Sequence, residues 1–182
     1  MNRKSLNHLT MAALFAALTA ALTTVHILNL PNGAFVHLGD LFVFLAGCLL
    51  PTPYAMAAAA VGGGLGDLFS SALPWAPATI VIKAAVAGLL SAKRDRLLTR
   101  RNALMTLPYA AITLTCYALY ELALVALGLF PNKEVWTAIL AASIGFNALQ
   151  VTASAALFFA AAAALDRLGF KQKLMRREGS RP

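Results

Sequence analysis

The sequence is poor in charged residues, and especially in acidic ones. Asp, Glu, Lys and Arg make up 12% of the 182 residues, and only seven residues are acidic. Soluble domains usually have about a quarter of their residues charged, so this shortage excludes an ordinary soluble domain. Apolar residues are correspondingly abundant: they account for 60% of the chain, and the mean hydropathy is +0.73. We therefore expect lipid to surround most of the surface.

Cysteines and the common catalytic motifs are also scarce. Cys48 and Cys116 stand singly inside apolar stretches, which is typical of small buried side chains rather than of a disulfide or metal site. The three histidines lack metal-ligand spacing, and neither HExxH nor GxSxG occurs. The glycine-rich run 62–66 lacks the Lys-Ser/Thr of a phosphate loop, so close helix packing explains it better. The sequence thus predicts no catalytic residue, no metal and no cofactor.

Six apolar stretches are candidates for membrane-spanning helices, which need about 20 mainly apolar residues. The second is short, and we expect it to be tilted or partly re-entrant. We predict an all-α fold in one transmembrane domain, residues 1–182, built as an integral membrane bundle of six transmembrane helices. The predicted helices are 9–28, 35–50, 54–73, 75–92, 104–129 and 135–165.

The positive charges fall into three clusters that six spans place on one side of the membrane. Because Lys and Arg concentrate in cytoplasmic segments, this pattern predicts that both termini are cytoplasmic. The net charge of +8 then reflects topology, and we expect no nucleic acid partner. Topology also explains the basic tail 167–182, with binding to anionic membrane lipid as the alternative. The clusters are Arg3 and Lys4; Lys93, Arg94, Arg96, Arg100 and Arg101; and Arg167, Lys171, Lys173, Arg176, Arg177 and Arg181.

Polar residues inside the predicted spans are few, and an ionisable one costs at least about 2.5 to 3.5 kcal/mol in lipid. Several share one helix face, and most fall in the half opposite the basic clusters. We interpret them as an outward pocket for a small ring compound, with aromatic rings stacking on it. Mutual pairing of these groups, such as Lys83 with Asp67 or Asp40, is the alternative. The candidate binding residues are His37, Asp40, Trp75, Thr79, Lys83, Tyr117, Glu121, Asn147 and Gln150.

Small residues form two adjacent ridges along the first predicted helix. Alanine recurs every four residues in each ridge, and this spacing lets another helix approach closely. The pattern predicts a contact surface, either within the chain or for a partner protein. The ridges are Ala12, Ala16 and Ala20, and Ala13, Ala17 and Ala21.

Four motifs add a family resemblance to these features: HLGD at 37–40, LPTP at 50–53, GGGLGD at 62–67 and WAPATIVIK at 75–83. With the chain length, the six predicted helices and the alanine spacing, they resemble the substrate-binding S components of energy-coupling factor (ECF) vitamin transporters. The resemblance covers nearly the whole chain. The motifs are similar to the branch that includes riboflavin-, hydroxymethylpyrimidine- and pyridoxine-type S components.

The resemblance implies a function and a set of partners. The chain would bind a vitamin or vitamin precursor, an aromatic heterocycle such as hydroxymethylpyrimidine or pyridoxine, at the outer face of a prokaryotic plasma membrane. A coupling transmembrane protein would dock on the alanine ridges, and two cytoplasmic ATPases would hydrolyse ATP. The chain would be a transport subunit and not an enzyme. Its binding groups would come from the loop 32–37 and from the fourth to sixth helices.

Two other functions fit parts of the pattern. An autonomous ion-coupled carrier would use Asp40, Asp67, Lys83 and Glu121 as a charge relay, although the sequence shows no inverted repeat of the kind usual in such carriers. An intramembrane lipid-modifying enzyme would need Asp40 and Asp67 to hold a metal, with access from the cytoplasm. The outward position expected for both carboxylates argues against that enzyme.

Overall fold

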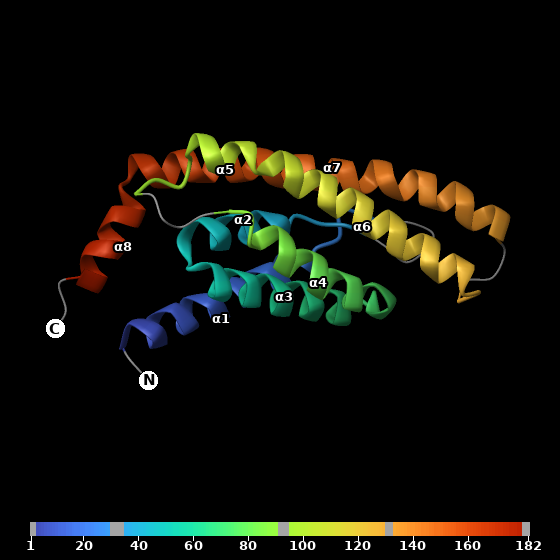
Figure 1. The fold of residues 1–182 in the computed structure, drawn as a ribbon, viewed down its shortest axis with the longest axis horizontal. Coiled ribbons are helices and arrows are strands. Elements are labelled where there is room, and N and C mark those ends of the chain that lie inside the picture. Colours follow the sequence, from blue (N-terminus) through green and yellow to red (C-terminus); the bar gives the residue numbers. More distant parts are fainter. Residues whose placement is uncertain (1–2, 30–34, 91–94, 130–132, 180–182) are drawn as a thin grey trace.

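The computed structural model describes residues 3–29, 35–90, 95–129 and 133–179, and nearly all of their regular structure is helical (Figure 1). The predicted all-α class is therefore confirmed for these residues. Their helices are α1 (Arg3–Thr23), α2 (Asp40–Leu49), α3 (Thr52–Phe69), α4 (Ala76–Ala87), α5 (Arg100–Leu104), α6 (Thr106–Ala126), α7 (Lys133–Arg167) and α8 (Phe170–Gly179), with a 3-10 turn, η1 (Leu73–Trp75), before α4.

A short pair of strands follows α1. Strand β1 (Leu28–Asn29) pairs antiparallel with β2 (Phe35–Val36). The first helix accordingly ends earlier than predicted, at Thr23, and the second begins later, at Asp40, because the strand pair lies between them. The run Thr-Thr-Val at 23–25 accounts for the end of α1, since β-branched residues have low helix propensity.

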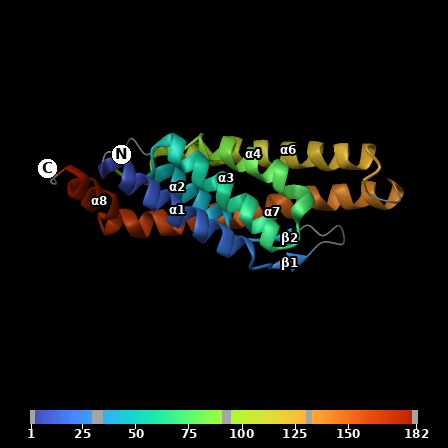
Figure 2. The ribbon, with the colours of Figure 1, turned by 90° about the horizontal axis from the view of Figure 1, so that it is seen from below.

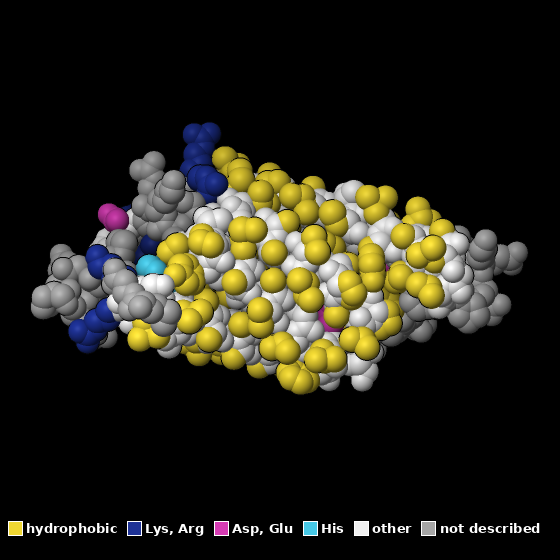
Figure 3. All heavy atoms as spheres, turned by 60° about the horizontal axis from the view of Figure 1, so that its bottom comes forward, with side chains coloured by type: hydrophobic (Ala, Val, Ile, Leu, Met, Phe, Trp, Pro, Cys, Tyr) yellow, Lys and Arg dark blue, Asp and Glu magenta, His cyan; other side chains and the backbone are white. Residues whose placement is uncertain are grey.

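Within the described ranges, three helical segments are long and apolar enough to cross a membrane: Arg3–Thr23, Arg100–Ala126 and Leu140–Arg167. The apolar segments Asp40–Leu49 and Leu73–Ala87 are shorter. Large apolar side chains cover most of the face seen in Figure 3, while Lys and Arg gather at one end. This surface is that of a membrane-embedded helical bundle, and the number of six spans stays a prediction.

The described parts of the three basic clusters meet at one end of the bundle, while Lys93, Arg94 and Arg181 lie outside the described residues. Helix α1 starts there and α8 ends there, and both views of the ribbon show this shared end (Figures 1 and 2). The segment that leads into α5, with Arg96, Arg100 and Arg101, lies at the same end (Figure 1). We call it the basic end. Its assignment to the cytoplasmic side rests on the charge rule and stays a prediction.

Hydrogen bonds between side chains and backbone groups connect distant segments at the basic end. The Asp166 carboxylate accepts hydrogen bonds from the backbone N–H groups of Leu97 (2.8 Å) and Leu98 (2.9 Å). Lys171 of α8 is buried and donates to the backbone oxygen of Cys48 in the last turn of α2, at 2.7 Å. Burial lowers the pKa of Lys171, while its position suits a helix C-terminus, where carbonyl groups attract cations. The expected basic tail thus includes a helix that is held against the bundle.

Glycines of the run 62–66 bring α1, α3 and α4 close together. A Cβ at Gly62 would lie 2.7 Å from the backbone oxygen of Ala16, and one at Gly63 would lie 2.9 Å from Thr79 Cγ2. Such contacts are too short for any real side chain, which confirms helix packing as the role of this run. The Ala12, Ala16 and Ala20 ridge is buried inside the bundle, whereas the Ala13, Ala17 and Ala21 ridge is exposed.

Candidate substrate-binding pocket

A pocket opens in the half of the bundle away from the basic end. Its walls come from β2, the last turn of α3, the η1 turn, the start of α4, the second half of α6 and the first half of α7. The empty space measures about 380 Å³, part of it open to solvent. It is lined by Phe35, His37, Asp67, Ala72, Trp75, Thr79, Tyr117, Glu121, Asn147 and Gln150.

Seven of the nine predicted binding residues line this pocket: His37, Trp75, Thr79, Tyr117, Glu121, Asn147 and Gln150. The other two, Asp40 and Lys83, lie beneath it, one helical turn further along from His37 and Thr79. Asp67 also lines the pocket, although the sequence suggested it as a partner for Lys83 and in the two alternative functions, and not as a binding residue. Phe35 falls in the loop 32–37 that the resemblance implied as a source of binding groups, whereas Ala72 is apolar and carried no pattern that could have marked it. Residues 32–34 of the predicted binding loop lie outside the described residues.

Hydrogen bonds hold the rings of Trp75 and Tyr117 in place in the pocket wall. Trp75 Nε1 donates to Glu121 Oε1 at 3.1 Å, and Ser143 Oγ donates to the same oxygen at 2.9 Å. The hydroxyls of Tyr117 and Thr79 are 2.8 Å apart and hydrogen bonded. Fixed rings of this kind offer preformed faces for a planar ligand.

Beneath the pocket, Asp40 and Lys83 form a buried ion pair. Lys83 Nζ lies 2.5 Å from Asp40 Oδ1, and neither side chain is more than 1% exposed. Gln150 Nε2 donates to Asp40 Oδ2 at 3.3 Å, and Gln150 Oε1 accepts from the backbone N–H of His37 at 3.2 Å. The pair therefore connects α2, α4 and α7 and positions Gln150 in the pocket wall. Of the two partners considered for Lys83, Asp40 is the one that its ammonium contacts.

The hydrogen bonds of His37 determine its charge state. The backbone N–H of Gly39 donates to His37 Nδ1 at 3.0 Å. An accepting Nδ1 carries no proton, so the imidazole is neutral and its Nε2–H is a donor. The ring also lies 5.6 Å from that of Phe35, measured between centroids. His37 therefore contributes no positive charge to the pocket.

Stacked aromatic rings lie between the pocket and the basic end. Phe44 stacks on Tyr109, with centroids 4.2 Å apart, and on Phe158, with centroids 5.2 Å apart. Tyr109 is two turns deeper than Tyr117 on α6, and Phe158 is two turns deeper than Gln150 on α7. All three rings of the stack are fully buried. The pocket is thus closed on its inner side in this conformation.

The described helices form an apolar bundle with a polar pocket near one end, and stacked aromatic rings close the inner side of that pocket. These features are typical of a membrane protein that binds a small molecule. The chain matches the family model of the ECF-type riboflavin transporter S component over residues 3–167 and belongs to this family. It is therefore a substrate-specific membrane subunit of an ECF transporter, a transport subunit rather than an enzyme, as the motifs indicated. No curated protein matches the chain.

Proposed function

We propose that this subunit binds a small vitamin or vitamin precursor, an aromatic heterocycle such as hydroxymethylpyrimidine or pyridoxine, at the outer face of a prokaryotic plasma membrane. One observation carries the proposal: polar groups and aromatic rings converge in the half of an apolar bundle opposite the basic end. Because basic segments stay cytoplasmic, that half faces outward. The rings of Trp75 and Tyr117 stack on the ligand, and the polar groups around them bind its edge.

Energy comes from partner proteins in this proposal. A coupling transmembrane protein binds the subunit, and two cytoplasmic ATPases drive release of the ligand inward. The exposed ridge Ala13, Ala17 and Ala21 is the docking surface that we propose, since small side chains let a partner helix approach the backbone of α1. Ala12, Ala16 and Ala20, the other predicted docking residues, face the interior of the bundle. We therefore place the docking contact on the exposed ridge.

Ligand binding is tested by fluorescence of the purified full chain in lipid nanodiscs. The sequence has two tryptophans, so a Trp136→Phe background leaves Trp75 as the only one. We expect one member of a panel to quench it: hydroxymethylpyrimidine, pyridoxine, thiamine, riboflavin, pantothenate or a queuosine precursor. Trp75→Ala removes the fluorescent reporter, so its affinity is measured by calorimetry; binding of that ligand should weaken by about tenfold, because an aromatic stack contributes about 0.5 to 1.5 kcal/mol beyond its buried area. Absence of binding by the whole panel contradicts the proposal.

Docking is tested with two matched tryptophan substitutions on α1. Ala17→Trp adds bulk to the exposed ridge, and we expect it to abolish copurification with the coupling protein while ligand affinity stays unchanged. Ala16→Trp adds the same bulk on the buried ridge, where it should instead lower the thermal stability of the isolated subunit. Wild-type copurification by the Ala17→Trp variant would remove the exposed ridge from the docking surface.

The buried Asp40–Lys83 pair is the feature that would favour an autonomous ion-coupled carrier instead. Both oxygens of Asp40 are hydrogen bonded, to Lys83 and to Gln150, which suits a structural pair better than a site that binds and releases ions. Liposomes that contain this chain alone separate the two functions. We expect no uptake of the ligand under a proton gradient, whereas gradient-driven uptake would favour the carrier.

A further inference from the structure

We propose that the pocket selects a ligand whose ring carries N–H donors and a positive charge, such as a protonated aminopyrimidine, over neutral rings of the same size. This inference rests on the proposed function and specifies the class of substrate for the same site. It follows from two carboxyl groups in the pocket wall, each with one oxygen that accepts no hydrogen bond from the described residues.

Asp67 supplies the first unpaired oxygen. Its side chain lines the pocket and is only 5% exposed. The Thr79 side chain is its polar neighbour, but Oδ2 is buried without any hydrogen-bond partner among the described residues. A buried acceptor without a partner is costly, and a ligand that donates to Oδ2 removes this cost.

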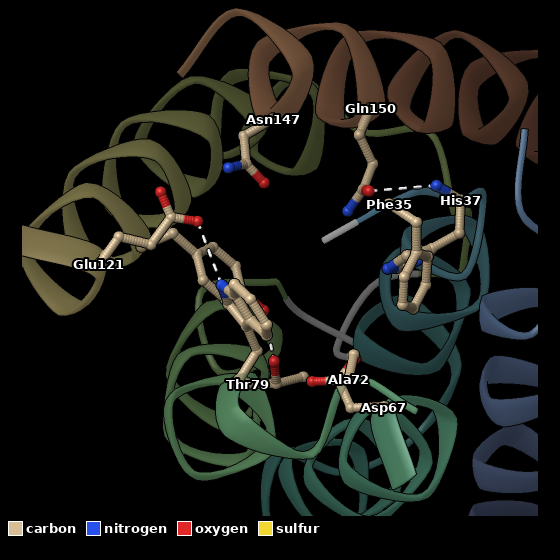
Figure 4. Close-up of a pocket in the computed structure, with 10 residues that line it drawn as sticks. Phe35, His37, Asp67, Ala72, Thr79, Glu121, Asn147 and Gln150 are labelled. Atoms are coloured by element: carbon tan, nitrogen blue, oxygen red, sulfur yellow. Dashed lines mark hydrogen bonds between the residues drawn. The ribbon is translucent and has the colours of Figure 1, made fainter. Parts of the chain in front are cut away.

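Glu121 supplies the second oxygen. It is also 5% exposed, and both of its hydrogen bonds, from Trp75 and from Ser143, end on Oε1. Within the described part of the chain, Oε2 accepts none. In Figure 4, Glu121 and Asp67 lie on different sides of the pocket. Two acceptors placed apart in this way suit a ring with donors at two separate positions.

The charges around the pocket are not balanced by the protein. Its lining contains two carboxyl groups and no Lys or Arg among the described residues. His37 is neutral, since its Nδ1 accepts a hydrogen bond. Lys83 is near enough to act on Asp67 electrostatically, but its ammonium contacts Asp40. A cationic ligand is therefore the partner that balances the remaining negative charge.

The size of the space limits the ligand as well. The space between the lining side chains is small, about 380 Å³ even when the part open to solvent is counted. We therefore expect a ligand with a single heterocycle between the rings of Trp75 and Tyr117 and the two carboxyl groups. Protonated aminopyrimidines combine that size with an exocyclic N–H₂ group and a ring N–H⁺, which form charge-assisted hydrogen bonds with carboxylates.

The experiment compares two ligands that differ in one group. We measure the affinity of the full chain in nanodiscs for 4-amino-5-hydroxymethyl-2-methylpyrimidine and for its 4-oxo analogue, which is neutral, with riboflavin as a larger neutral ring. We expect the amino compound to bind at least about tenfold more tightly than either neutral ring, because charge-assisted hydrogen bonds are about twice as strong as neutral ones. Equal or tighter binding of a neutral ring overturns the inference and leaves the proposed function intact.

Substitutions then locate the preference. Asp67→Asn and Glu121→Gln keep the shape of each side chain but remove its charge, and each should reduce the amino-to-oxo affinity ratio by about tenfold. Asp95→Asn is the matched control, because Asp95 is exposed and lies outside the pocket lining. An unchanged ratio in both pocket variants overturns the inference. If Asp67→Asn does not fold, Glu121→Gln and the wild-type ligand comparison still decide it, and failure of every ring to bind contradicts the proposed function itself.

Discussion

Replacing Lys83 with methionine removes the positive member of the buried pair while keeping most of its apolar stem. Asp40, which is 0% exposed, is then left as a buried carboxylate that keeps its hydrogen bond from Gln150 but has lost its counter-charge. Removing one partner of a buried ion pair usually costs about 3 to 5 kcal/mol. In a chain of this length, each kcal/mol lowers the melting temperature by about 2 to 4 °C, so we expect Lys83→Met to lower it by about 6 to 20 °C.

The assay is thermal unfolding of the purified subunit in nanodiscs, carried out as a double-mutant cycle. Asp40→Asn alone leaves Lys83 buried without its counter-charge and should be similarly destabilising. The double variant, Asp40→Asn with Lys83→Met, removes both charges and should recover much of the lost stability. Losses that simply add in the double variant, or a Lys83→Met variant that melts within about 2 °C of wild type, would refute a structural ion pair at this position.

The remaining predictions concern helix packing and the basic end. Gly62→Ala should lower the free energy of unfolding by about 1 to 3 kcal/mol, because its Cβ would meet Ala16 of α1. Gly145→Ala, where a Cβ would meet nothing within 4 Å, should raise the free energy of unfolding by about 0.5 to 1 kcal/mol; equal effects in thermal melts would contradict the packing role of Gly62. Lys171→Met should speed amide hydrogen exchange in α8 without changing ligand affinity, because it removes the bond to Cys48. Lys173→Met, at an exposed position, should leave that exchange at the wild-type rate.

Helical periodicity was sufficient to predict most of the pocket. Tyr117 and Glu121 are four residues apart on α6, and Asn147 and Gln150 are three apart on α7, so each pair had to share a face whatever the neighbouring helices were. The penalty for polar groups in lipid indicated that these faces turn inward. Each argument needs only the residues of a single helix, and the structure shows that all four side chains line the same pocket.

Features that depend on contacts between distant segments could not be predicted in this way. The partner of Lys83 depends on how α4 lies against α2, and either Asp40 or Asp67 satisfied the sequence pattern. The helix α8 is held by a bond between Lys171 and Cys48, which are 123 residues apart, while its composition indicated only a basic tail. The strands β1 and β2 have two residues each, too few for an alternating pattern to be recognised.

The polar groups of this bundle divide into two sets that lipid penalises equally but that act differently. Asp40, Lys83 and the amide of Gln150 satisfy one another and hold helices together, so substitutions there should change the melting temperature first. Among the bonds between described residues, Asp67 Oδ2 and Glu121 Oε2 accept none, and both side chains line the pocket, so substitutions there should change affinity and ligand preference first. Hydropathy and residue spacing cannot distinguish the two sets, because both consist of polar residues on inward-facing sides of helices. Only the hydrogen bonds between helices separate the residues that build the pocket from those left to bind its ligand.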